Sequence, residues 1–250
     1  MDTHGTKHYY SYAGAYFVLE VNNLSRSTTI GGGAKKFAGH FNGNGNTIQF
    51  TYSAEDSYIG VFAYIYAGGH VHHLNVAANI TKGSYQIGGV AGRNDGTVSY
   101  CNVSGTVTSS LVNNNDKQVG GIVGYNRGTV EGCHNSATVS GDNVVGGIVG
   151  YNNKDTEVPV AVVKNCYNTG AVSGTASTGG IVGRNIGEIY YCVNNGTVTS
   201  STTTNYGAIV GNNAKTASLE NSGTIEYVYD FKVNRQEIGK STRLNSSHAT

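Results

Sequence analysis

The stretch Gly120-Gly121-Ile122-Val123-Gly124-Tyr125-Asn126 decides how this chain folds, because close copies of it recur along the sequence. The other copies begin 32 residues before it and 26, 59 and 87 residues after it, at Gly88, Gly146, Gly179 and, in degenerate form, Gly207. A cysteine follows each of the first four copies, at Cys101, Cys133, Cys166 and Cys192, and Leu219 takes the equivalent place after the last. The shortest interval, 26 residues, is taken as the repeating unit, and the longer intervals are expected to contain insertions at its corners.

Each unit contains short runs rich in Val, Ile and Thr, separated by two or three Gly or Asn residues. One run follows the glycine doublet, a second surrounds the cysteine, and a third carries a valine such as Val107 or Val139. The connections are too short for a crossover helix, so each strand has to pair with its equivalent in the next unit. The sequence therefore predicts an all-β fold, a single-stranded parallel β-helix (β-solenoid) of about seven coils, each rising about 4.8 Å. A right-handed winding is expected from other parallel crossovers.

The chain divides into three parts. Residues 1–36 are expected to form a partial N-terminal coil or entry region, 37–230 the solenoid, and 231–250 a tail. Within the tail, Lys240–His248 resembles the translation of a sequencing-library adapter, so 237–250 is expected to be non-native. The aromatic run 227–231 is expected to be a last strand without its natural cap. Exposed strand edges there predict end-to-end self-association.

Composition limits the classes of function. Hydrophobic residues make up 38% and charged residues 12%, with 37 glycines, and the net charge is +1. This charge gives no reason to expect nucleic acid or an anionic membrane as a partner. No run approaches the roughly 20 apolar residues that span a bilayer. A secretory signal pattern is also missing from the N-terminus, so a signal peptide and anchor are expected to lie in other parts of a longer protein.

The repeat resembles the GLUG-motif repeats of bacterial surface proteins over roughly residues 37–226. The resemblance is carried by Gly-Gly-Ile-Val-Gly-Tyr-Asn and by the downstream Asn-Cys-Tyr-Asn-Thr-Gly-Ala-Val-Ser-Gly at 165–174. Residues 37–48 look like the coil that often precedes such repeats, and Ile59-Gly60-Val61-Phe62 matches the next coil. Asn42 stands where that coil usually has Asp, which weakens a calcium-binding interpretation.

The resemblance implies a bacterial, extracellular or cell-surface setting but no particular activity. The family includes adhesins, uncharacterised wall proteins and the non-catalytic region of immunoglobulin-A-cleaving metallopeptidases. We therefore expect a non-catalytic adhesive scaffold or stalk, with an extracellular glycan or a host surface protein as the candidate partner. An accessory domain of a secreted metallopeptidase is the alternative.

Two kinds of side chain recur at positions expected to be structural. The cysteines are too far apart in sequence for a metal knuckle, and Leu219 at the fifth position indicates that the site requires apolar volume, so buried free thiols are expected. Asparagines are expected to hydrogen-bond from coil to coil. They form two rows, Asn94, Asn126, Asn152, Asn185 and Asn213 in the first and Asn135, Asn168, Asn194 and Asn221 in the second.

One row is the candidate ligand-binding surface. The residue before each asparagine of the first row is an arginine or tyrosine in four coils, namely Arg93, Tyr125, Tyr151 and Arg184. These groups either stack on one another and rigidify a corner, or form an amphipathic strip for sugar rings. The insertions near 109–116 and 153–159 are further candidates, because loops on rigid scaffolds often carry recognition.

Catalysis finds little support in the sequence. His-Glu-x-x-His, Gly-x-Ser-x-Gly and phosphate-binding glycine motifs are absent, and carboxylates are scattered, so neither an enzyme nor a cofactor is predicted. In His70-Val71-His72-His73, two histidines would share a strand face and His73 would point away. His70 and His72 are a candidate two-ligand metal site, but no carboxylate lies nearby in sequence to complete it, although a neighbouring coil could supply one. These histidines are therefore expected to face solvent.

Ice binding is the least favoured alternative. It needs regular rows of threonines on a flat face, and Thr106/Thr108 and Thr197/Thr199 fit such rows. The intervening coils carry Thr138/Ser140 and Ala171/Ser173, which break the regularity.

Overall fold

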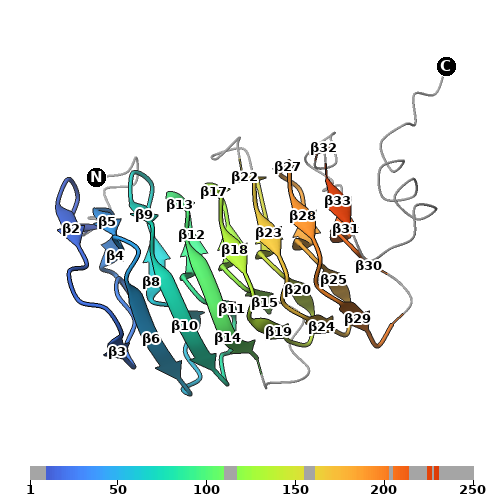
Figure 1. Cartoon of the computed structure of the whole chain (residues 1–250), viewed down its shortest axis with the longest axis horizontal. Helices are drawn as coiled ribbons and strands as arrows, with labels where there is room; N and C mark the ends of the chain where they lie inside the picture. Colours follow the sequence, from blue (N-terminus) through green and yellow to red (C-terminus); the bar gives the residue numbers. More distant parts are fainter. Residues whose placement is uncertain are drawn as a thin grey trace.

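The protein is a parallel β-solenoid. A computed structural model describes residues 10–109, 117–154, 161–202, 205–213, 224–226 and 228–230. Throughout these residues the strands pair in parallel, and successive coils lie side by side in about seven turns (Figure 1). The predicted fold class is confirmed. Leu219, Asn221, most of both predicted insertions and the tail lie outside the described residues. Strand pairing corrects the places predicted for Leu219 and Asn221, because Val193 pairs with Tyr229 and Asn194 with Asp230, so residues nine positions further along the chain take them.

Four sheets, here called A to D, run the length of the stack. Sheet A has eight strands: β1 (Tyr10–Ser11), β4 (Lys36–Phe37), β8 (Phe62–Ile65), β12 (Ala91–Asn94), β16 (Val123–Asn126), β21 (Val149–Asn152), β26 (Val182–Asn185) and β31 (Val210–Asn213). Sheet B also has eight: β2 (Tyr16–Val18), β5 (His40–Asn42), β9 (His70–His72), β13 (Thr97–Ser99), β17 (Thr129–Glu131), β22 (Val162–Lys164), β27 (Glu188–Tyr190) and β32 (Thr224–Glu226).

The other two sheets change along the stack. Sheet C begins with the single strands β3 (Leu24–Arg26), β6 (Thr47–Tyr52), β10 (Asn75–Ile80) and β14 (Asn102–Thr108). In later coils this side is split into two short strands, giving β18 (His134–Asn135), β19 (Thr138–Ser140), β23 (Tyr167–Asn168), β24 (Val172–Gly174), β28 (Val193–Asn194), β29 (Val198–Ser200) and β33 (Tyr229–Asp230). Sheet D contains β7 (Tyr58–Ile59), β11 (Gln86–Gly88), β15 (Gln118–Gly120), β20 (Val144–Gly146), β25 (Ser177–Gly179) and β30 (Tyr206–Gly207).

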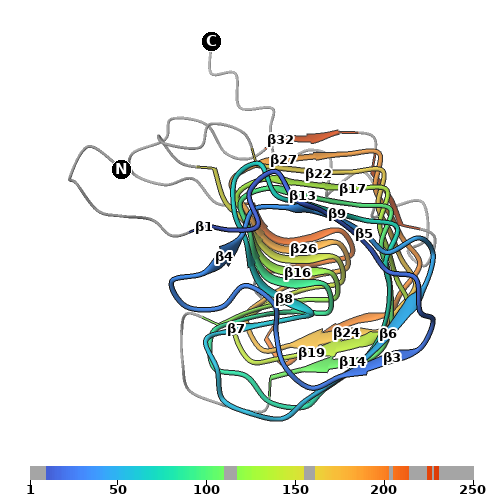
Figure 2. The same cartoon turned by 90° about the vertical axis from the view of Figure 1, so that its left-hand side faces the viewer.

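The glycine doublets form the turn between sheets D and A. Seen end-on, sheet B lies along the top of the section, sheet C lies at the lower right, and β8, β16 and β26 of sheet A lie near its middle (Figure 2). A Cβ on Gly146 would overlap the carbonyl oxygen of Val149, and one on Gly150 would lie 2.8 Å from the backbone nitrogen of Val119. Only glycine allows the two sheets to approach this closely.

Aliphatic side chains fill the interior in columns. Val123, Val149 and Val182 are buried at equivalent places of sheet A, and isoleucines following the doublets, such as Ile122 and Ile148, are fully buried at the turn. The first coils are filled by aromatic rings instead, because Phe37 and Phe41 both contact Phe62, with ring centroids 4.8 and 5.3 Å away. Burial of these columns supplies the main favourable contribution to folding.

The cysteines lie at a corner rather than within a strand, which corrects the predicted strand around each of them. The residue before each cysteine has a positive φ, at Tyr100 (52°), Gly132 (62°), Asn165 (54°) and Tyr191 (51°). This left-handed conformation ends the strand of sheet B and turns the chain into sheet C. The corner thereby separates two strands where the sequence predicted one.

Among the residues that the structure describes, there is no helical segment with the length and apolarity that crossing a bilayer requires.

Candidate functional site

The predicted Arg/Tyr row forms one column on sheet A. Parallel pairing places Arg93 beside Tyr125, Tyr125 beside Tyr151, and Tyr151 beside Arg184. The column extends further toward the N-terminus than predicted, because Tyr64 of β8 pairs with Arg93. These five residues, together with Lys36 of β4, are called the cation–aromatic ladder below.

Cations and rings are in contact along this ladder. The Arg93 guanidinium carbon lies 4.7 Å from the centroid of the Tyr64 ring and 5.4 Å from that of Tyr125. Lys36 Nζ lies 4.7 Å from the Tyr64 centroid, so cations from both neighbouring coils lie over this ring. The rings of Tyr125 and Tyr151 meet edge to face at 5.4 Å, and Arg184 lies 5.0 Å from Tyr151. Such contacts stabilise the stacking of neighbouring coils.

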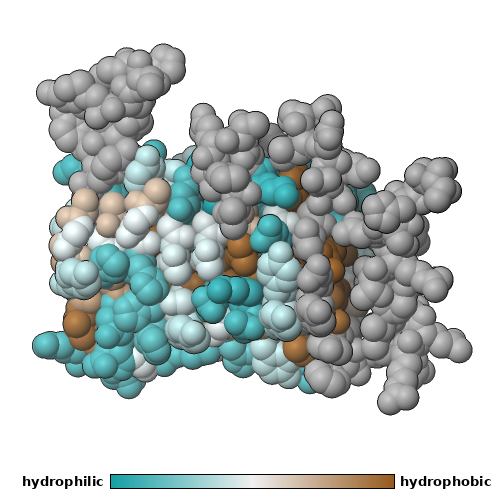
Figure 3. Space-filling model, turned by 90° about the horizontal axis from the view of Figure 1, so that it is seen from above, coloured by the Kyte–Doolittle hydropathy of each residue, from teal (hydrophilic) through white to brown (hydrophobic). Residues whose placement is uncertain are grey.

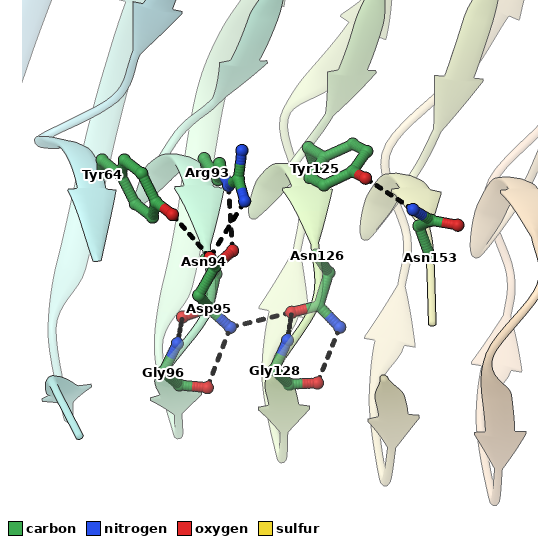
Figure 4. Close-up of polar contacts among 9 residues, drawn as sticks. All are labelled: Tyr64, Arg93, Asn94, Asp95, Gly96, Tyr125, Asn126, Gly128 and Asn153. Atoms are coloured by element: carbon green, nitrogen blue, oxygen red, sulfur yellow. Dashed lines mark hydrogen bonds and ion pairs between the residues drawn. The ribbon is translucent and has the colours of Figure 1, made fainter. Parts of the chain in front are cut away.

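Asp95 anchors the centre of the ladder (Figure 4). It accepts hydrogen bonds from Arg93 Nε at 2.9 Å, from Arg93 Nη2 at 3.0 Å and from the Tyr64 hydroxyl at 2.5 Å. The Arg93 and Asp95 side chains are only 20% and 10% exposed. In the next coil, the Asn153 amide donates to the Tyr125 hydroxyl at 2.5 Å. The polar groups of Tyr64 and Arg93 and the Tyr125 hydroxyl are thus already engaged within the protein, whereas Arg184 Nε is buried without a hydrogen-bond partner.

Burial and Asp95 set the protonation states. Burial, together with the hydrogen bond to Asp95, raises the pKa of the Tyr64 hydroxyl well above its usual range. Burial alone would lower the pKa of Arg93, but its hydrogen bonds and charge interaction with Asp95 outweigh this effect and raise it. Burial also raises the pKa of Tyr151, against the opposing charge of Arg184. At neutral pH Arg93 is therefore charged, and the hydroxyls of Tyr64 and Tyr151 are neutral.

The first asparagine row forms a continuous amide ladder in the interior. Each Nδ2 donates to the Oδ1 of the next coil, at 2.8 Å from Asn94 to Asn126 and from Asn126 to Asn152, 2.9 Å from Asn152 to Asn185, and 3.0 Å from Asn185 to Asn213. The same amides hold the corner backbone, as where Asn94 accepts from Gly96 N at 3.1 Å (Figure 4). Buried polar groups of the corner are satisfied in this way.

A second amide ladder runs beside sheet C. Asn135 donates to Asn168 and Asn168 to Asn194, both at 2.8 Å, and all three side chains are buried. Asn135 and Asn194 also accept hydrogen bonds from Ala137 N and Gly196 N, each at 3.1 Å. Both ladders therefore join neighbouring coils and hold the turns within each coil.

The cysteine row lies in the core. All four thiols are buried and form no disulfide, and each Sγ lies 3.2 to 3.3 Å from the carbonyl oxygen two residues earlier. Burial raises the pKa of the Cys101 and Cys166 thiols, which disfavours the reactive thiolate. These thiols fill space and make weak hydrogen bonds.

The histidines of β9 differ from their predicted arrangement. His73 has a positive φ of 51° and its Nδ1 lies 2.8 Å from Nδ1 of His72, so the prediction that it points away is wrong. Strict alternation fails here because the strand ends at His72 and the chain turns. Burial, and then the neighbouring histidines, lower the pKa of His70 and His72.

Three residues of the candidate site were missed by sequence reasoning: Lys36, Tyr64 and Asp95. A sequence signal for Tyr64 was present, because Tyr64 follows Phe62 by two positions just as Arg93 follows Ala91. The resemblance to the repeat was followed only from Ile59 to Phe62, so Tyr64 was not included. Asp95 carries no repeat signal, since its counterparts in the next coils are Arg127 and Asn153. Its role depends on side-chain contacts.

The surface above sheet B carries mostly polar residues. Seen from this side, the described atoms are predominantly teal and white, with brown apolar patches scattered among them (Figure 3). Glu131 and Lys164 form an ion pair across neighbouring coils of this sheet at 3.2 Å.

Comparison with known proteins agrees with this architecture. The family model described as the GLUG motif matches residues 83–108, 115–140 and 141–173. No significant match was found among curated proteins. Among solved structures, the crystal structure of "a putative immunoglobulin A1 protease from Bacteroides ovatus" is similar, with a TM-score of 0.63, 22% identity, and coverage of 87% of this chain and 68% of that one. At this identity the likeness concerns the fold alone. The chain is a β-solenoid that contains GLUG-motif repeats between residues 83 and 173.

Proposed function

We propose that this chain is a non-catalytic scaffold or stalk segment of a bacterial cell-surface or secreted protein. The observation that carries this proposal is the buried amide ladder from Asn94 to Asn213, which joins five successive coils. A stack whose coils are joined inside by amides and outside by stacked rings resists bending between coils. Such a rod is suited to hold other segments of a protein at a fixed distance.

The cation–aromatic ladder supports the scaffold role more directly than a glycan-binding role. Stacking on a sugar requires an open ring face, whereas cations lie over Tyr64 from two coils and Arg93 lies against two rings. The donors of Arg93 are bound by Asp95. The ladder therefore contributes rigidity to the stack of coils. If the protein does bind a glycan on this ladder, substitution of Tyr125 and Tyr151 is where the loss of binding would first be detected.

A glycan and host-protein array distinguishes the two roles. The scaffold proposal expects no specific binding by the full chain and the same profile for Tyr125→Ala and Tyr151→Ala. Tyr167→Ala is the matched control, because it removes an exposed ring from sheet C. Binding that is lost in the two ladder variants, but kept in Tyr167→Ala, would replace the scaffold proposal with a binding module. Antibody labelling of intact cells expressing the parent protein tests the surface location.

The accessory domain of a secreted metallopeptidase is a second candidate. It is favoured by the fold likeness to a protein named as an immunoglobulin A1 protease. Sequencing the parent gene beyond codon 237 tests it, because that candidate requires a His-Glu-x-x-His segment elsewhere in the protein. A wall anchor or further coils would favour the stalk.

A further inference from the structure

Four of the eight histidines gather on the outer side of sheet B and its following corner. His40 of β5 pairs in register with His70 of β9, and their ring centroids are 6.0 Å apart. His70 and His72 lie 4.6 Å apart along β9, and the His72 and His73 rings 5.0 Å apart. Residues 30 positions apart in sequence thus contribute to one continuous group of imidazoles.

His72 and His73 form the tightest pair of this group. Their Nδ1 atoms lie 2.8 Å apart, a distance at which the two nitrogens share one proton. The positive φ of His73 turns its ring toward His72, and the His73 ring stacks on Tyr100 at 5.2 Å with an interplanar angle of 27°. Because Tyr100 also has a positive φ and is half exposed, the pair is held at an open corner that solutes reach.

His70 is held in an orientation suited to a metal ligand. Its Nε2 lies 2.8 Å from the hydroxyl of Ser99 in the next coil, and Ser99 is buried. When Nε2–H donates to this hydroxyl, the lone pair of Nδ1 is left available. Imidazole ligands are commonly fixed by such a hydrogen bond from the nitrogen that does not bind the metal.

We propose that His72 and His73 chelate one divalent transition-metal ion through their Nδ1 atoms, with His70 as the next ligand in reach. Two nitrogens bound at right angles at about 2.0 Å stand roughly 2.9 Å apart, close to the separation observed here. The ion takes the place of the shared proton, and the histidine that donated it adopts its other tautomer with the proton on Nε2, so that both ligands are neutral imidazoles. Within the described residues no group of three histidines, cysteines or carboxylates is already arranged for a metal, so His70 has to rotate or water completes the coordination.

The chemistry of the site favours Cu²⁺ among such ions. Imidazole binds Cu²⁺, Ni²⁺ and Zn²⁺, affinity in this series is highest for Cu²⁺, and a short nitrogen–nitrogen separation suits its tetragonal geometry better than the wider tetrahedral angle of Zn²⁺. The four histidines bring no negative charge to offset that of the ion. The site is therefore suited to an ion that keeps part of its hydration shell, with water as its remaining ligands.

Titration of the full chain with Cu²⁺ in a weakly chelating buffer tests this proposal by calorimetry and electron paramagnetic resonance. His4, His8 and His248 are replaced by Ala in the parent, so that the remaining histidines are those the structure describes. One ion per chain is expected, with nitrogen hyperfine structure from two or three imidazoles. His72→Ala and His73→Ala should each weaken binding about tenfold or more.

His134→Ala is the matched control, because His134 lies on sheet C, stacked on Tyr167, away from this group, and should leave affinity unchanged. Circular dichroism establishes that each variant folds, and His73→Gln replaces His73→Ala if the latter does not. The proposal is overturned if the parent binds no Cu²⁺, if affinity survives both substitutions in folded protein, or if His134→Ala weakens binding equally.

Discussion

Both carboxylate oxygens of Asp95 accept hydrogen bonds from one edge of the Arg93 guanidinium, although the two residues are only two positions apart in the chain. The Nε–Oδ1 and Nη2–Oδ2 distances are 2.9 and 3.0 Å, while the guanidinium carbon lies between the rings of Tyr64 and Tyr125. A cation placed among rings with little exposure needs a nearby carboxylate. The pair therefore allows an arginine to take part in the stacking of coils.

Asp95→Ala should lower the free energy of unfolding by about 1–3 kcal/mol, because it leaves the Arg93 donors and the Tyr64 hydroxyl without their acceptor. Urea denaturation followed by circular dichroism measures this change. Glu131→Ala is the control, since it removes the more exposed ion pair with Lys164 and should cost no more than about 1 kcal/mol. Equal losses in both variants would contradict the structural role assigned to Asp95.

Asn126→Ala should destabilise the protein by about 1–3 kcal/mol, because it interrupts the amide ladder and removes the buried hydrogen bonds that join Asn126 to Asn94, Gly128 and Asn152. Asn102→Ala is its match, as Asn102 donates to Asn75 at the same 2.8 Å but at an exposed position. We expect the second change to cost less than about 1 kcal/mol in thermal or urea unfolding. If the amide ladder did not stabilise the protein, Asn126→Ala and Asn102→Ala would lower the free energy of unfolding by the same amount.

The four cysteines should be unreactive in the native protein. All four thiols are buried, so a thiol reagent does not reach them in the native protein, and burial raises the pKa of Cys101 and Cys166. Ellman's reagent should detect none of them before unfolding and all four in concentrated urea. Rapid labelling of any cysteine in native protein would show that this column is accessible.

Stability should fall as the pH rises between about 10 and 12. Burial and the hydrogen bond to Asp56 raise the pKa of Tyr52 to about 12, and the pKa values of Tyr64 and Tyr151 are also raised, while an unfolded tyrosine ionises near 10. The unfolded state therefore loses protons first and becomes favoured. Urea unfolding at several pH values measures the slope, which Tyr52→Phe should reduce. A slope unchanged in Tyr52→Phe would exclude Tyr52 as a contributor.

The protein should self-associate end to end at high concentration. Sequence analysis placed this tendency at residues 227–231, of which Tyr227 and Phe231 lie outside the described residues. At the other end, β2 is the outermost strand of sheet B, and Tyr16 and Val18 are 78% and 55% exposed. Val18→Lys should reduce the mass measured by light scattering, because charged edge residues oppose strand pairing. Thr138→Lys lies within the stack and should leave the measured mass unchanged. A protein that stays monomeric at all concentrations would refute the prediction.

Much of the architecture was predictable because a solenoid repeats its local sequence. Equivalent residues of successive units stack, so the spacing of Gly120 and Gly146 was enough to predict that Tyr125 meets Tyr151 and Asn126 meets Asn152. The corners were less predictable. The strand around Cys101 was wrong because Tyr100 adopts a left-handed conformation that is uncommon for tyrosine, and only Gly132 and Asn165, at the equivalent positions of later coils, are residue types that favour it.

The sequence by itself determined the fold class, the repeat and the central members of each ladder, because these depend on periodicity along the chain. Only the tertiary structure decided what the side chains do: that Asp95 binds Arg93 and Tyr64, that Lys36 covers Tyr64, and that His40 joins the histidines of β9. The physical reason is that these contacts depend on corner dihedral angles and side-chain orientation. Neither follows from spacing alone.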